Sequence, residues 1–220
     1  MKDTTMTTSN NVASNNTVTH QRAQWDDTDP GAATVVEAGT ETVIDTGRTV
    51  ALGMYGARGW TGTAKIGTII HPYRTNQVWS DGLDDDECEY DITMVQPFDP
   101  FTGLPGYAAR QLLDTLTESN LDDRQNLAPT CRELLTIAAE RDDVELVGYG
   151  VGPARHDERV SIEGFMYYPR NDFADLTPRN AWERIRRDLN ITTQHGAPDE
   201  VLRFRPHWCP GREGWWVWWD

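Results

Sequence analysis

The segment WWVWW at residues 215–219 places five large apolar side chains in succession. Because side chains alternate between the two faces of a β-strand, Trp216 and Trp218 share one face and the other three residues share the opposite face. Both faces of this predicted strand are therefore apolar. Such a strand lies at the centre of a sheet that is covered on both sides, or it presents its second face to a partner or a flat ligand.

The first half of the chain is rich in β-branched and apolar residues between glycines and prolines, a composition typical of strands. Four strands are predicted there, at residues 34–45, 49–57, 64–71 and 89–98. A tight turn at Gly47 is expected to join the first two. The third stops before Pro72 and the fourth ends at Pro97. We therefore expect a sheet to open the folded part of the chain.

The apolar spacing then changes to a helical period. A first helix is predicted from Tyr107 to Glu118, and a second from Leu127 to Arg141. Pro129 in the second helix is tolerated only in a first turn, so this helix begins close to it. A polar loop separates the two, which predicts an antiparallel helical hairpin.

A third helix has a clear start signal, because Thr177 is suited to the N-cap position and Pro178 to the first helical position. Asn190 is expected to end it. Its apolar stripe consists of Trp182, Ile185 and Leu189, and its other face carries Arg179, Arg184, Arg186 and Arg187. Further strands are predicted at residues 144–149, 160–168, 201–205 and 215–219.

These elements predict two parts of the chain. Residues 1–33 are rich in Ser, Thr and Asn, so they bury too little apolar surface to offset their ordering entropy and should form a flexible, disordered N-terminal tail. Residues 34–220 should form a single α+β domain with a mostly antiparallel sheet, a helical hairpin and one further helix. Three helices will cover only one side of the sheet, which leaves an aromatic face open to self-association or to a partner.

The charge of the chain limits its partners. It carries 35 acidic and 20 basic residues, for a formal net charge of −15. Such a surface repels phosphate backbones and anionic lipids, so we expect no direct nucleic-acid binding and no membrane association. It favours a protein partner with a basic surface, although a salt-rich or GC-rich background would also produce an acidic chain. The polar N-terminus lacks the apolar core of a signal peptide, and this predicts a cytoplasmic protein.

Seven carboxylates crowd into eleven residues in one acidic run. They are Asp81, Asp84, Asp85, Asp86, Glu87, Glu89 and Asp91. Their spacing does not fit an EF-hand calcium loop. The run is either a patch that faces a basic partner or a solvated loop. We assign the run to a partner-binding surface, together with Trp215, Trp216, Trp218 and Trp219.

Residue spacing offers little support for catalysis or metal binding. His156 beside Asp157 has the groups that acid–base catalysis uses, but both lie in a predicted exposed turn. If they lay on a strand, His207 and Cys209 would share a face, but a metal site needs three or four ligands. The three cysteines are too far apart for a disulfide framework. We predict no metal and no cofactor, and His156, Asp157 and His207 are the catalytic candidates that remain.

Together these patterns favour a non-enzymatic acidic protein-interaction domain. It would occupy a basic, nucleic-acid-binding surface of a partner protein and so act as a DNA mimic. Two hypotheses from other classes stay open. One is an enzyme with a cleft formed by histidine and carboxylates. The other is a structural component of a larger assembly, such as a virus particle or a mobile element, in which the chain would form a homo-oligomer.

Overall fold

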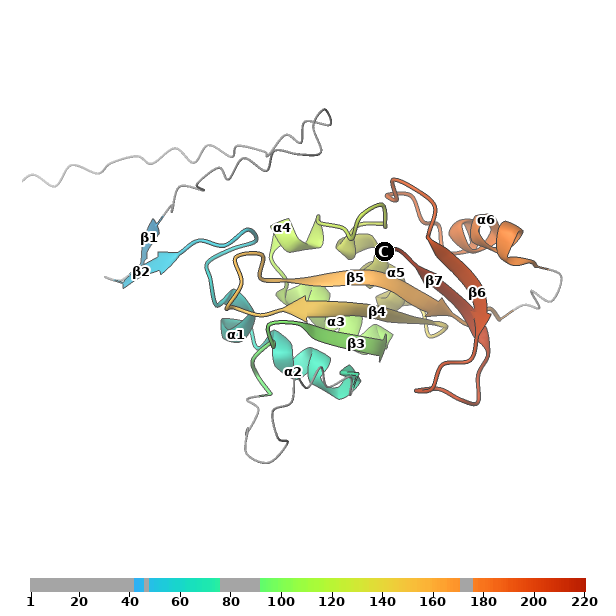
Figure 1. Ribbon diagram of the computed structural model, residues 1–220, viewed down its shortest axis with the longest axis horizontal. Coiled ribbons are helices and arrows are strands. Elements are labelled where there is room, and N and C mark those ends of the chain that lie inside the picture. Colours follow the sequence, from blue (N-terminus) through green and yellow to red (C-terminus); the bar gives the residue numbers. More distant parts are fainter. Residues whose placement is uncertain (1–41, 46–47, 76–91, 171–175) are drawn as a thin grey trace, which may run out of the picture. The chain divides into compact units, whose positions relative to one another are not determined.

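The computed structural model describes residues 42–45, 48–75, 92–170 and 176–220, all within one compact unit, Thr40–Asp220. These residues form an antiparallel five-stranded sheet backed by helices, which confirms the predicted α+β class (Figure 1). The predicted tail, the first predicted strand up to residue 41 and the acidic run from Asp81 to Asp91 lie outside the described residues.

The main sheet has the strand order β3-β4-β5-β7-β6, and every neighbouring pair is antiparallel. Its strands are β3 (Asp99–Leu104), β4 (Val144–Val151), β5 (Arg159–Tyr167), β6 (Glu200–Phe204) and β7 (Gly214–Trp218). A separate hairpin joins β1 (Thr42–Asp45) to β2 (Arg48–Ala51). β7 therefore lies between two partners, and β3 and β6 form the edges of the main sheet.

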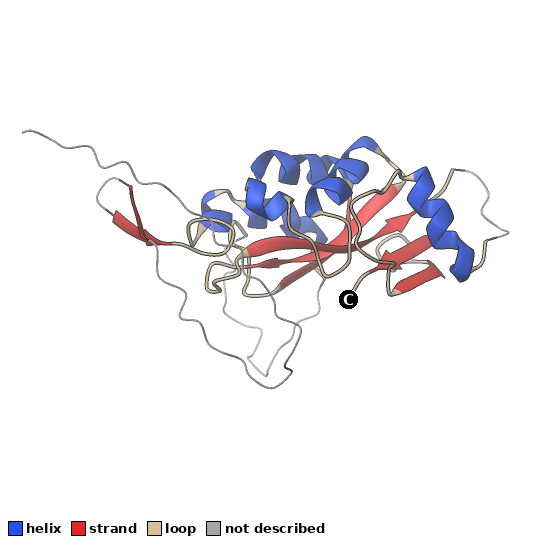
Figure 2. Cartoon of the chain, turned by 90° about the horizontal axis from the view of Figure 1, so that it is seen from above, coloured by secondary structure: helices blue, strands red, loops and turns tan. Residues whose placement is uncertain are grey.

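The helices gather along one side of the main sheet, as Figure 2 shows. They are α1 (Trp60–Thr63), α2 (Ile66–Ile70), the 3-10 helix η1 (His71–Tyr73), α3 (Gly106–Thr115), α4 (Glu118–Leu121), α5 (Cys131–Glu140) and α6 (Pro178–Asp188). α3 packs against α5, and α5 contacts β4 and β5. The hydrophobic core lies between this layer and the sheet, with Phe101, Leu112, Leu135 and Phe165 fully buried.

β7 shows the alternation that its sequence predicts. Trp215, Val217 and the following Trp219 are 2%, 0% and 0% exposed and belong to the core. Trp216 and Trp218 are half-buried on the opposite face. The Trp219 ring meets the Trp182 ring of α6 edge-on, with 5.4 Å between the ring centroids. One strand thus supplies side chains both to the core and to the second face of the sheet.

Two of the predicted strands are wrong. Residues 64–71 form α2 and the start of η1, because Ile66 and Ile70 are one helical turn apart and both are 0% exposed. The described part of 89–98 forms turns, and strand β3 begins only at Asp99. β3 contains Pro100, which has no N–H to donate but is tolerated because β3 is an edge strand.

Several boundaries also differ from the predictions. The second predicted strand ends at Ala51 rather than at residue 57. The first predicted helix ends at Thr115 and is followed by the short helix α4. The second begins at Cys131 rather than at Leu127, because Thr130 is the N-cap and its side chain accepts a hydrogen bond from the backbone N–H of Glu133.

The third predicted helix is confirmed as α6. The backbone N–H of Thr177 donates to Oδ1 of Asn180 at 2.8 Å, which is half of a capping box, and Pro178 is the first helical residue. Asn190 has a left-handed backbone with φ of 54°, as expected of a residue that ends a helix.

β7 pairs with only the last part of β5, and an asparagine side chain bonds the backbone of β5 where β7 is absent. β7 pairs only with Gly164–Tyr167 of β5. Beyond that point the Asn120 side chain from α4 donates to the carbonyl of Val160 at 2.7 Å and accepts from its N–H at 2.8 Å. Asn120 is 0% exposed, so it satisfies buried backbone groups that would otherwise lack partners.

The close pairing of β4 and β5 predicts a large difference between two glycine substitutions. A Cβ added at Gly148 would lie 2.0 Å from the carbonyl oxygen of Ser161, whereas one at Gly211 would have nothing within 4 Å. We expect Gly148→Ala to lower the free energy of unfolding by about 3 kcal/mol and Gly211→Ala to leave it unchanged. Urea denaturation measures both, and equal stabilities would contradict the described register.

Candidate functional site

The face of the sheet opposite α3 and α5 turns toward the viewer in Figure 1. Strand alternation places β6 and β7 side chains on it, and the β6–β7 loop adds one more indole. We call this surface the tryptophan face, and it consists of Trp208, Trp216, Trp218, Leu202, Phe204, Glu145, Glu163 and Glu200. It combines half-buried indoles with carboxylates, which makes it a candidate binding surface.

The apolar part of the tryptophan face is formed by β6 and β7. Leu202 is the register partner of Trp216, so the two side chains lie side by side on the same face. The Phe204 ring lies 5.9 Å from the Trp216 ring between centroids, and Phe204 remains 39% exposed. These side chains form an apolar strip that solvent still reaches.

Each indole of the tryptophan face lies beside a different glutamate, and two of them donate their N–H groups to it. Nε1 of Trp208 lies 2.8 Å from Oε2 of Glu145, and Nε1 of Trp216 lies 2.9 Å from Oε2 of Glu200. The Trp218 indole lies close enough to the Glu163 carboxyl to lower its pKa. Each ring thus lies beside a carboxylate that has further lone pairs for another donor.

These three glutamates form no ion pair with the arginines and lysines among the described residues, which sets them apart from Asp143 and Asp157. Burial raises the pKa of the Glu163 carboxyl, the Trp218 indole opposes this shift, and the nearby Asp220 adds to it. The tryptophan face therefore has negative charge that no described cation balances.

Of the predicted histidine candidates, His207 borders the tryptophan face, with its ring 5.1 Å from the Trp208 ring between centroids, and His156 lies elsewhere. His156 is exposed in the β4–β5 turn, as expected. Its neighbour Asp157 accepts two bonds of 2.8 Å from Arg155 and one of 2.9 Å from Arg159. The hydrogen bond from Arg155 is the largest cause that lowers the pKa of Asp157. Asp157 is therefore held as an ion-paired carboxylate rather than as a partner of His156.

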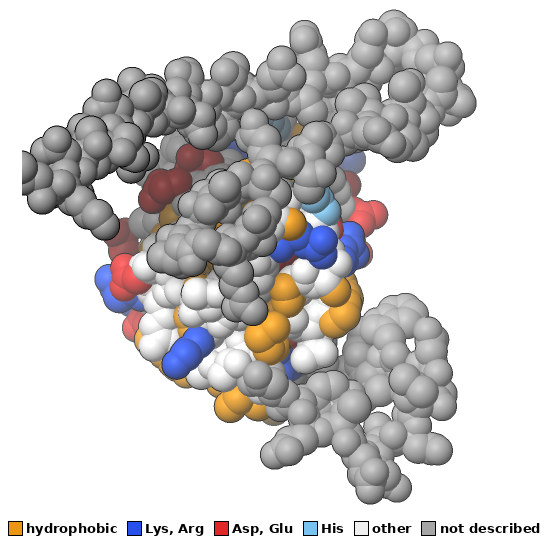
Figure 3. Space-filling view, turned by 90° about the vertical axis from the view of Figure 1, so that its left-hand side faces the viewer, with side chains coloured by type: hydrophobic (Ala, Val, Ile, Leu, Met, Phe, Trp, Pro, Cys, Tyr) orange, Lys and Arg blue, Asp and Glu red, His pale blue; other side chains and the backbone are white. Residues whose placement is uncertain are grey.

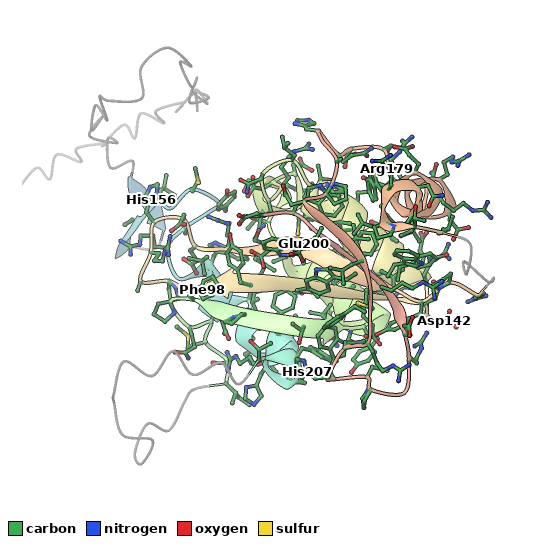
Figure 4. The ribbon with its side chains drawn as sticks, turned by 45° about the vertical axis from the view of Figure 1, so that its right-hand side comes forward. Phe98, Asp142, His156, Arg179, Glu200 and His207 are labelled. Carbon is green, nitrogen blue, oxygen red and sulfur yellow. The ribbon has the colours of Figure 1, made fainter. Side chains whose placement is uncertain are left out.

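His207 lies in the turn after β6 and not on a strand, so the condition for sharing a strand face with Cys209 is not met. His207 and Cys209 instead line a cavity of about 570 Å³ beside Arg74. Figure 4 shows His207 and His156 well separated, so they do not form one cleft. Among the described side chains, no group of three or more His, Cys, Asp or Glu is placed to hold a metal ion.

Figure 3 looks at the end of the sheet where the β4–β5 turn lies. Apolar side chains reach the surface there beside basic ones, and Met54 and Phe98 are 60% and 50% exposed. The Phe98 ring lies 5.0 Å from the Tyr149 ring between centroids. Arg159 bonds the Tyr149 hydroxyl at 2.8 Å and also pairs with Asp157, so its charge is balanced by a described neighbour.

The structure separates the four tryptophans predicted to bind a partner. Trp216 and Trp218 lie on the tryptophan face, and Trp215 and Trp219 lie in the core. The glutamates beside the indoles were missed by the sequence predictions. The period-two pattern of residues 200–204 placed Glu200 on one face with Leu202 and Phe204, but pairing them with Trp216 requires the register between β6 and β7.

Comparisons of the chain with protein-family models, with curated proteins and with solved structures find no match. The function of the tryptophan face therefore has to be inferred from its own geometry. Among the helices of the described part of the chain, none is long and apolar enough to cross a lipid bilayer.

The raised pKa of Glu163 predicts a pH dependence of stability. Because the folded protein holds this proton more tightly than the unfolded chain does, the contribution of the protonated group is present at acid pH and is lost as the pH rises through the raised pKa. Glu163→Gln keeps an acceptor oxygen beside Trp218 but cannot ionise. Relative to the wild type, its free energy of unfolding should therefore increase between about pH 4 and about pH 7.

Urea denaturation of both proteins at the two pH values measures this difference. Since both proteins share all other titrating groups, the comparison isolates Glu163. A difference in stability that does not change with pH would contradict the assigned environment of Glu163.

Proposed function

We propose that this chain is a protein-interaction module whose tryptophan face binds a cationic segment of a partner protein. The observation that supports the proposal most directly is the set of three indole–glutamate pairs in which no glutamate has a described cationic partner. A partner that supplies guanidinium or ammonium groups would complete these pairs. The negative charge of the glutamates indicates a cationic partner. The position of the three indoles indicates where on the protein that partner binds.

The chemistry of the pairs suits arginine in particular. A guanidinium group stacks on an indole with about 0.5–2 kcal/mol of attraction, and its planar N–H groups bond a carboxylate in the same plane. Trp216 with Glu200 forms one such pair, and Trp218 with Glu163 forms another. In each pair, the ring on which a guanidinium group could stack lies beside a carboxylate that could accept its N–H groups. One completed pair would contribute about 1.5–3 kcal/mol, which is roughly a tenfold to hundredfold gain in affinity.

The charge of the whole chain acts on the same partner at longer range. A net charge of −15 attracts a basic protein before contact and raises its association rate. We propose further that the basic partner surface is one that binds nucleic acid, which the acidic chain would then block. This narrower proposal depends on the carboxylates of the entire chain, whereas the binding of a cationic segment depends only on the tryptophan face.

A peptide of alternating arginine and serine residues tests the proposal. We expect the peptide to bind and to quench tryptophan fluorescence, and we expect Glu200→Gln and Trp218→Phe each to weaken the affinity about tenfold. Glu118→Gln is the matched control, since it removes the same charge from an exposed position on α4 where Glu118 pairs with Arg132. The control should bind like the wild type.

Salt distinguishes this binding from an apolar association. Raising sodium chloride from about 50 mM to about 500 mM shortens the screening length, so the peptide affinity should fall steeply. If Glu118→Gln weakened the peptide affinity as strongly as Glu200→Gln does, only the total charge would matter. That result would rule out the tryptophan face as the binding site.

A further inference from the structure

A second cavity of about 640 Å³ opens at the end of the sheet where β4 begins and β5 ends. Asp142, which Figure 4 labels, marks this end, and it lies far from His156. The cavity is lined by Asp142, Asp143, Tyr168, Arg170, Arg203 and Arg212, among others. Its lining differs from the tryptophan face because three guanidinium groups reach it from three separate segments of the chain.

Aromatic rings hold two of these guanidinium groups in place. The guanidinium carbon of Arg212 lies 3.9 Å from the centroid of the Tyr168 ring, and that of Arg203 lies 5.3 Å from the Trp215 ring. The Tyr168 hydroxyl donates to Glu145 at 3.0 Å, which fixes the ring beneath Arg212. A stacked guanidinium keeps its N–H groups in a fixed plane and free to donate sideways.

The carboxylates of the lining already have cationic partners. Asp143, whose side chain is 4% exposed, accepts bonds of 2.8 Å and 2.9 Å from Arg141. Asp142 pairs with Arg170, and Glu213 pairs with Arg203. Arg212, in contrast, forms no ion pair with a carboxylate in the described part of the chain. The lining therefore holds a pre-oriented cation that these carboxylates do not neutralise.

The cationic character extends from the cavity to α6. Arg141 links the two, because it bonds Asp143 at the cavity and also the Asp188 carbonyl of α6 at 3.3 Å. The exposed face of α6 carries Arg179, Arg184 and Arg187. Guanidinium groups thus occur both at the cavity and on α6, beside the exposed carboxylates Asp142 and Glu183.

We propose that this cavity binds a phosphoryl group, with Arg212 as the principal donor and Arg170 and Arg203 as its neighbours. A tetrahedral anion has three or more acceptor oxygens, so it can accept from Arg212 while it shares Arg170 and Arg203 with the carboxylates that already pair with them. The cavity volume also leaves room for the group that carries the phosphate. The ligand of this site has the opposite charge to that of the tryptophan face, and the two sites adjoin because the Tyr168 hydroxyl donates to Glu145.

Isothermal titration at constant ionic strength tests the site with two probes, inorganic phosphate and phenyl phosphate, against a chloride background. We expect saturable binding at one site per chain for at least one probe. Binding of phenyl phosphate alone assigns the site to phosphomonoesters, and binding of inorganic phosphate alone assigns it to the free anion. Absence of saturable binding for both probes would overturn the proposal.

Variants of Arg212 locate the binding. Arg212 is exposed, so Arg212→Gln should fold normally and weaken the affinity about tenfold. Arg212→Lys keeps the charge but loses the planar donors, and it should weaken the affinity as well. The matched control is Arg179→Gln on α6, which makes the same charge change and should bind like the wild type. Equal weakening by Arg179→Gln would show diffuse attraction to arginines and would refute a defined site.

Discussion

The position of β7 between β5 and β6, with helices on one side of the sheet, is the constraint on which the rest of the structure depends. It sends Trp215, Val217 and Trp219 into the core, where a fully buried tryptophan contributes roughly 4–6 kcal/mol of hydrophobic stabilisation. The same alternation obliges Trp216 and Trp218 to lie on the opposite face. The core and the candidate site therefore use opposite faces of one strand. The packing of the core side chains fixes the position of this strand, and the strand in turn fixes the positions of Trp216 and Trp218.

Local patterns in the sequence were sufficient for much of this architecture. The α+β class, the strands β4 to β7, and helix α6 with its cap at Thr177 all follow from short-range periodicity and capping residues. The error at residues 64–71 has a physical cause, since isoleucines suit a strand by propensity but recur here at helical spacing. The burial of Ile66 and Ile70 in the core favours the helix over the strand.

The candidate sites were beyond local patterns because they join residues from distant segments. Trp208 and Glu145 are 63 residues apart in sequence, and their hydrogen bond depends on how the β6–β7 loop folds back over β4. The stacking of Arg212 on Tyr168 has the same origin. Net charge, which sequence does supply, is also a poor guide to local charge. The chain carries −15 overall, yet the cavity at one end of its sheet is lined by three arginines beside three carboxylates.

Nuclear magnetic resonance of the indole N–H groups tests the central claim most directly. On titration with the peptide of alternating arginine and serine, the resonances of Trp208, Trp216 and Trp218 should shift together and saturate. Those of Trp60 and Trp219, whose N–H groups donate to backbone carbonyls away from the tryptophan face, should stay in place. Shifts spread over all the indoles, or none at the three tryptophans of the face, would contradict the account.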